Sequence, residues 1–209
     1  MCLVLRKSRI QGERYSMAIY VECNQYLDEI KRQIGLVADP SGNSSSLQFL
    51  QANTMTLGDH VAVNLYTKIA FPTGSAGTDL GAQLIEKLAN QTLMSIFIHG
   101  VDGSFSTSTF DRLGTETRYE LAKDNGLTIT STNSPEVNIY VNGSSTNQSY
   151  AIKIGFMTWT NEKPFVLLYH ELKHAEGDIY NKSSGHWKLI PEVNEFRTQR
   201  QLGYERWRM

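Results

Sequence analysis

The most apolar run of this 209-residue chain ends in two histidines, and its pattern predicts a helix. The run reads PFVLLYHELKHAEG, from Pro164 to Gly177. Proline suits the first helical turn and glycine commonly follows a helix end, so both boundaries match helix signals. We therefore predict a helix over residues 164–177. It places His170 and His174 on one face, because residues four apart lie about one turn apart.

His170, Glu171 and His174 form the pattern H-E-x-x-H, in which two imidazoles on one helix face can bind a single Zn²⁺. The glutamate can then act on a metal-bound water, first as general base and later as general acid. From the His and Glu frequencies of this chain, a chance match is on the order of one in a hundred. The pattern predicts His170 and His174 as metal ligands and Glu171 as the catalytic residue. The alternative is a helix with two surface or packed histidines.

A catalytic zinc ion needs a third protein ligand and one open position for water. A second helix is predicted from Pro191 to Gly203, and it carries Glu192 and Glu195. Either carboxylate can face back onto the first helix. Spacing alone does not choose between them.

Five other polar residues near these segments are weaker candidates. Glu176 and Asp178 follow the histidines, but we expect them to be loop carboxylates because Gly177 should end the helix. His186 can be a ligand or a transition-state donor, or a loop residue. Tyr204 can stabilise an oxyanion or pack the C-terminus. We expect His99 to be a hydrogen-bonded histidine at a strand end.

The rest of the chain predicts a mixture of strands and helices. Residues 60–71 and 94–100 suit strands, and the leucines and isoleucine between them recur at helical spacing. A short amphipathic helix is predicted over residues 24–36. An Asn-Gly turn signal between two alternating runs predicts a β-hairpin over 136–156. If strand 137–143 or 150–156 lies at a sheet edge, an extended substrate can pair with it.

Charge and hydropathy exclude several classes of partner. The chain has 20 basic and 21 acidic residues, for a net charge of −1, so no basic surface for nucleic acid or an anionic membrane is indicated. No apolar run approaches membrane-spanning length, and the N-terminus does not have the order of a secretory signal. The two cysteines, Cys2 and Cys23, do not form a disulfide or metal-ligand pattern.

Two segments carry a resemblance to known families. LLYHELKHAEGD, followed by PEVNEFRTQRQLGYE, is similar to the NleD-like zinc metallopeptidases over residues 164–204. The Asn-Glu dipeptide in VNEFRT also resembles the gluzincins of the thermolysin type, in which a Glu on a second helix completes the zinc site. This resemblance favours Glu195 as third ligand, with Glu192 in reserve. Gln199 stands where the thermolysin type has an Asp, so the partner of His170 does not carry over.

The resemblance implies a fold, an activity and a setting. The expected fold is α+β: a small zincin-like domain with a mostly antiparallel sheet packed on helices. We expect a metallopeptidase domain over residues 46–209 and an N-terminal arm over 1–45, serving as export signal or partly disordered, with the boundary in the Ser-rich segment 39–46.

NleD-like proteins include bacterial type III secreted effectors that cleave mitogen-activated protein kinases. The expected function is therefore a zinc endopeptidase that acts on a host signalling protein, in the host cytoplasm, after secretion without a cleaved signal peptide. The alternative is a non-catalytic effector that binds a host protein and has a structural or degenerate metal site. The presence of Glu171 argues against it, because a structural site needs ligands but no base.

Overall fold

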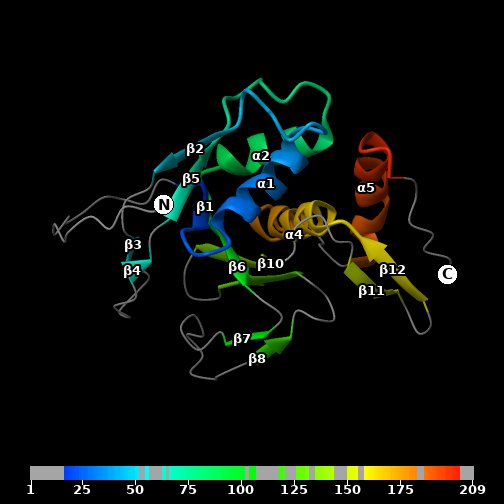
Figure 1. Ribbon diagram of the computed structural model, residues 1–209. Coiled ribbons are helices and arrows are strands. Elements are labelled where there is room, and N and C mark those ends of the chain that lie inside the picture. The colour runs from blue at the N-terminus through cyan, green and yellow to red at the C-terminus, as the bar shows by residue number, and fades with distance from the viewer. Residues whose placement is uncertain are drawn as a thin grey trace.

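The computed structural model describes residues 17–51, 55–56, 63–64, 66–101, 104–106, 118–120, 126–131, 135–143, 150–154, 158–182 and 186–202. Within these ranges the fold is mixed α+β, with four helices packed against a six-stranded sheet (Figure 1). The expected α+β class is confirmed. No helix in the described part of the chain combines the length and hydropathy needed to span a membrane.

The central sheet has the strand order β2-β5-β1-β6-β10-β9. Its members are β1 (Ile19–Glu22), β2 (Gln48–Gln51), β5 (Tyr66–Ala70), β6 (Ser95–Val101), β9 (Gly126–Thr130) and β10 (Glu136–Asn142). β1 and β10 run parallel to β6, and the other three pairings are antiparallel. β9 therefore forms one edge of this sheet and β2 forms the other.

Three two-stranded ladders accompany the central sheet. They are β3 (Met55–Thr56) with β4 (Val63–Asn64), β7 (Ser104–Ser106) with β8 (Arg118–Glu120), and β11 (Tyr150–Ile154) with β12 (Thr158–Glu162).

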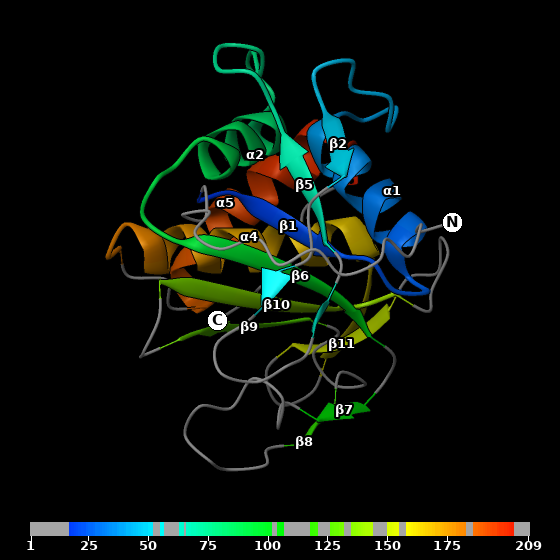
Figure 2. The same cartoon turned by 90° about the vertical axis from the view of Figure 1, so that its left-hand side faces the viewer.

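All four helices lie on the same face of the sheet, as Figure 2 shows with the strands in front. They are α1 (Leu27–Ala38), α2 (Leu80–Ala89), α4 (Pro164–Ile179) and α5 (His186–Gln199). Alternate strand residues such as Ile19, Ile98 and Ile139 are fully buried in one cluster with the helices. This is the alternation that a strand produces when one of its faces meets the core.

α4 is the central helix of this layer. Leu168, Leu172, Ala175 and Ile179 recur at intervals of four, three and four residues and are buried against the sheet side. On another flank, Tyr169 stacks on Phe196 of α5, with ring centroids 3.9 Å apart and planes within 7°. α4 thus contacts the sheet and α5 through different faces.

The ends of α4 and α5 differ from the expected ones. α4 continues through Gly177 to Ile179, so Glu176 and Asp178 are helical and not loop residues. Beyond the last helical residue, Asn181 has a φ of 51°, and the N–H of Lys182 bonds to the carbonyl of Gly177 at 2.8 Å. This is the bonding of a Schellman cap, with asparagine in place of the more common glycine.

α5 ends at Gln199 in the same way, with the left-handed conformation two residues later at Gln201, which has a φ of 57°. The N–H of Leu202 bonds to the carbonyl of Arg197 at 3.0 Å. The expected stop at Gly203 was therefore late. Its start was also misplaced, because α5 begins at His186 and contains Pro191 in its interior.

Several expected elements are confirmed and one is wrong. The strand at 94–100 is β6, the helix at 24–36 is α1, and the helix between the two predicted strands is α2. β5 lies within the predicted strand 60–71, part of which lies outside the described residues. The predicted hairpin over 136–156 does not form, because β10 pairs with β6 and β9 while β11 pairs with β12.

The first strand and helix also belong to the central structure. β1 lies between β5 and β6, and α1 contributes Ile30 and Ile34 to the main core. Residues 19–38, expected in an arm before the domain, are therefore part of its sheet and helix layer. Residues 1–16 lie outside the described part of the chain.

We predict that Gly81→Ala destabilises the fold, although alanine stabilises an isolated helix by about 1 kcal/mol relative to glycine. A Cβ at Gly81 would lie 1.9 Å from the carbonyl oxygen of Val37 in α1 and 2.9 Å from Cε2 of Phe196. Relief of this overlap must separate α1 from α2, so we expect a loss of about 3 kcal/mol in chemical denaturation. The exposed Gln83→Ala in the same helix should change stability by only about 0.5 kcal/mol. Equal effects of the two substitutions would contradict the close contact.

Candidate functional site

The two histidines of α4 meet through their ring nitrogens. Nε2 of His170 lies 3.0 Å from Nε2 of His174, with the ring planes at 81°. Both side chains are partly buried. Two nitrogens bound to one tetrahedral zinc ion at about 2.0–2.1 Å would lie about 3.3 Å apart. The pair therefore has nearly the separation that two ligands of one ion require, and both nitrogens are of the type that zinc accepts.

Glu171 is a residue of α4, and its side chain extends to the edge strand β9. Its side chain is buried, with a residue exposure of 7%. Oγ1 of Thr128 donates to Oε2 of Glu171 at 2.6 Å and also lies 3.2 Å from its main-chain oxygen. On the same strand, Gly126 leaves room for the carboxylate, since a Cβ there would lie 2.9 Å from Oε1.

The helical repeat explains why these three residues face different neighbours. Successive residues on a helix are about 100° apart. Leu172 faces the core, Glu171 faces the sheet edge, and His170 lies one further step round. His174 follows one turn later on the histidine side. One short sequence thus places two imidazoles beside a carboxylate that a neighbouring strand holds.

Glu192, the reserve third ligand, takes part in a different interaction. It forms a salt bridge with Lys173 of α4, and Lys173 also contacts Glu176. Lys87 of α2 completes the network, with Nζ 2.5 Å from Oε1 of Glu176. Burial alone would raise the pKa of Glu176, but the hydrogen bonds from Lys173 and Lys87 outweigh it and hold this pKa below its usual value. The network joins α2, α4 and α5.

Glu195 is exposed, while Val193 and Phe196 on the same helix are buried. Glu195 follows Val193 by two residues, which is about 200° of rotation around the helix axis. Its side chain therefore points away from the buried side of α5. In the part of the chain that the structure describes, no group of three or more His, Cys, Asp or Glu side chains could hold a metal ion. The structure brings the ring nitrogens of His170 and His174 together and places Glu171 of the same helix against β9. Glu195 is exposed, so the third ligand stays a prediction.

The other candidates have separate positions. Tyr204 and the side chain of His186 lie outside the described residues. His99 is buried, with Nδ1 3.2 Å from Glu22 Oε2 and Nε2 3.0 Å from Asn138 Oδ1. It is therefore the hydrogen-bonded histidine that was expected.

Gln199, in the position of the thermolysin-type Asp, stabilises the start of α2. Its Oε1 accepts from the N–H of Leu80 at 2.9 Å, and its Nε2 donates to the carbonyl of Thr78 at 3.2 Å. The helix N-terminus gains an acceptor in this way. This role differs from that of the Asp in the resembling family.

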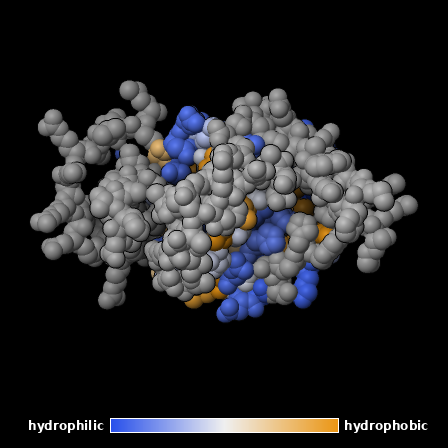
Figure 3. All heavy atoms as spheres, turned by 90° about the horizontal axis from the view of Figure 1, so that it is seen from below, coloured by the Kyte–Doolittle hydropathy of each residue, from blue (hydrophilic) through white to orange (hydrophobic). Residues whose placement is uncertain are grey.

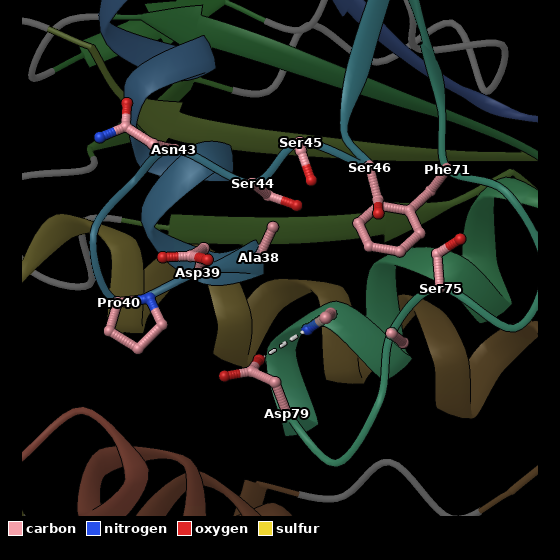
Figure 4. Close-up of a pocket in the computed structure, with 12 residues that line it drawn as sticks. Ala38, Asp39, Pro40, Asn43, Ser44, Ser45, Ser46, Phe71, Ser75 and Asp79 are labelled. Carbon is pink, nitrogen blue, oxygen red and sulfur yellow. Dashed lines mark hydrogen bonds between the residues drawn. The ribbon is translucent and has the colours of Figure 1, made fainter.

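A pocket of about 300 Å³ lies elsewhere, between the segment after α1 and the start of α2 (Figure 4). Asp39, Ser45 and Asp79 are among its lining residues. Asp79 accepts from the N–H of Ala82, as the dashed line shows, and Arg200 of α5 binds both of its carboxylate oxygens at 2.6 and 2.9 Å. These contacts give Asp79 a structural role in joining α2 to α5.

Seen from below, hydrophilic residues gather near the centre of the described surface and hydrophobic residues lie beside them (Figure 3).

Sequence reasoning did not identify Gly126 and Thr128, the β9 residues beside Glu171. Their only signal is the alternation in GLTIT, which is typical of a strand but names no partner.

Comparisons with protein-family models, with curated proteins and with solved structures found no match. The resemblance to NleD-like and thermolysin-type metallopeptidases therefore depends on the quoted motifs. The geometry around His170, Glu171 and His174 is independent of that resemblance.

We predict that Gly126→Ala displaces the Glu171 carboxylate. The added Cβ would lie 2.8 Å from Cγ and 2.9 Å from Oε1 of Glu171, so we expect a loss of about 2 kcal/mol in the free energy of unfolding. In a Glu171→Ala background the same substitution should cost much less, because the overlapping atoms are gone. Equal costs in both backgrounds, measured by chemical denaturation, would show that Glu171 does not lie against Gly126.

Proposed function

We propose that this protein is a zinc-dependent endopeptidase. The observation that carries the proposal is the 3.0 Å approach of the two H-E-x-x-H imidazoles, beside a carboxylate held by the sheet edge. Two nitrogen ligands and an adjacent base are the elements that metal-assisted hydrolysis of an amide requires.

In this proposal His170 and His174 hold Zn²⁺, and Glu195 is the proposed third ligand. When bound, the ion would polarise the substrate carbonyl and acidify a water molecule. Glu171 takes one proton from the attacking water as its oxygen bonds to the carbonyl carbon. It then passes this proton to the departing amine nitrogen as the carbon–nitrogen bond breaks.

The position of β9 at the edge of the sheet favours a peptide as the proposed substrate. The N–H of Ser131 bonds to the carbonyl of Glu136 on β10 at 2.9 Å, which makes these two a hydrogen-bonded pair. Along an antiparallel strand, residues alternate between bonding to the neighbouring strand through their N–H and C=O groups and directing these groups away from it. Thr128 and Gly126 therefore direct their N–H and C=O groups away from β10. An extended peptide can add to this edge beside Glu171. The edge expected at 137–143 is instead internal, since β10 has a partner on each side.

The arrangement suits the zincin-like fold that the resemblance implies. The H-E-x-x-H helix lies under a sheet whose edge strand is antiparallel to its neighbour. On the resemblance, the proposed substrate is a host signalling protein such as a mitogen-activated protein kinase. The proposed setting is the host cytoplasm, reached by type III secretion without a cleaved signal peptide.

One observation favours the alternative of a non-catalytic effector with a degenerate metal site. Glu195 is exposed and the described residues hold no three-ligand group, so the ligand set is incomplete as described. A protein of this kind would bind a host protein without cleaving it. The base at Glu171 would then have no function in hydrolysis.

We predict that the purified protein binds about one Zn²⁺ per chain and cleaves a peptide bond in recombinant mitogen-activated protein kinase. Glu171→Gln should keep the metal but lose activity by about a hundredfold or more, because an amide cannot take the proton. His170→Ala and His174→Ala should each lose both metal and activity. Metal content by mass spectrometry and cleavage by gel would be measured on the same samples. Full activity of Glu171→Gln would overturn the mechanism, and metal without cleavage of any protein would favour the alternative.

Substitution of each of the two candidate glutamates on α5 tests which of them is the third ligand. We predict that Glu195→Ala weakens zinc affinity by about tenfold or more, while Glu192→Ala keeps the affinity and lowers thermal stability slightly through loss of its Lys173 salt bridge. Titration with a competing chelator measures both. Wild-type affinity in Glu195→Ala would exclude this residue as a ligand.

A further inference from the structure

Two threonines of β9 bind two carboxylates of α4. Thr128 donates to Glu171 at 2.6 Å, and Thr130 donates to Asp178. The two threonines lie two residues apart and share one face of the strand. Their acceptors both lie on α4 and are seven residues apart, or about two helical turns. The edge strand is thus joined to the catalytic helix by two bonds of the same chemistry.

The first of these bonds fixes the orientation of a group that the proposed reaction uses. The hydroxyl of Thr128 binds Oε2 of Glu171, while Oε1 lies on the side of Gly126. A glutamate has three side-chain torsions, and ordering it costs conformational entropy. A general base must also lie within hydrogen-bond reach of the proton it accepts.

The sheet holds Thr128 in place. Thr128 pairs with Ile139 of β10, which is fully buried, and Gly126 pairs with Val141. A group on a paired strand is positioned more accurately than one on a loop. Thr128 therefore provides a donor that the sheet places beside Glu171, before any substrate binds.

We propose that Thr128 is a positioning residue for Glu171: its hydroxyl holds Oε2 and so fixes the orientation of the carboxylate for proton transfer. This inference rests on the proposed peptidase function. The competing interpretation is that Thr128 only attaches β9 to α4. Thr130 is the internal control, because it makes the same kind of bond to Asp178, which has no place in the proposed reaction.

The experiment compares Thr128→Val, Thr128→Ser and Thr130→Val in the zinc-loaded protein. Valine keeps the shape of threonine and removes the hydroxyl. We expect Thr128→Val to lower kcat about tenfold with KM and zinc content unchanged, and Thr128→Ser to restore kcat to within about twofold of wild type. Thr130→Val should lower thermal stability as Thr128→Val does but leave kcat within about twofold.

Two results would overturn the proposal. Equal losses of kcat in Thr128→Val and Thr130→Val would show that the bonds only attach the strand. Failure of Thr128→Ser to restore kcat would show that the methyl group, and not the hydroxyl, is what Glu171 requires.

A second measurement separates this proposal from the proposed function. Thermal unfolding of the metal-free protein is followed in a double-mutant cycle of Thr128→Val and Glu171→Ala, which reports the coupling of the two side chains without any activity. Coupling in the metal-free protein together with no hydrolysis by the wild type would mean that the contact exists and the peptidase function is wrong. Additive effects would mean that Thr128 does not hold Glu171, whatever the activity.

Discussion

The burial of the Glu171 carboxylate against the edge strand is the interaction on which the candidate site depends. A buried carboxylate is costly unless hydrogen bonds replace its water. Thr128 supplies such a bond, and Gly126 supplies the space that a side chain would fill. The sheet edge and α4 must therefore stay in register for Glu171 to lie beside the two histidines.

Contacts on the other flanks of α4 hold it in this position. Tyr169 stacks on Phe196, and Lys173 joins Glu176 to Glu192 across the helices. Lys173 is partly buried, and burial acts to lower its pKa, but the hydrogen bonds that it donates to these two glutamates outweigh burial and raise the pKa. Breaking one member of this network would leave a charge with less compensation.

Local patterns were sufficient for several elements and misleading for others. The helix at 164–177 and the strand at 94–100 followed from periodicity, and both exist in α4 and β6. Helix ends were less well predicted, because Asn181 and Gln201 adopt the left-handed conformation that the prediction had reserved for glycine. Glycine favours this conformation, but other residues adopt it where a cap and the surrounding packing support it.

The strand partners could not be read from the sequence. The turn signal after β10 suggested a hairpin, yet β10 is buried on both faces between β6 and β9. Alternation of apolar residues reports that a face is covered and not which strand lies beside it. The same limit hid Thr128 and Gly126, whose importance depends on Glu171, more than 40 residues later in the chain.

By itself, the sequence determined that His170, Glu171 and His174 share a helix, because their spacing and the helical repeat are both local. Only the tertiary structure decided that Glu171 meets β9, that Glu192 pairs with Lys173, and that Glu195 is exposed. These outcomes depend on how α4, α5 and the sheet rotate against one another. That rotation is set by the packing of many side chains at once, and no short motif encodes it.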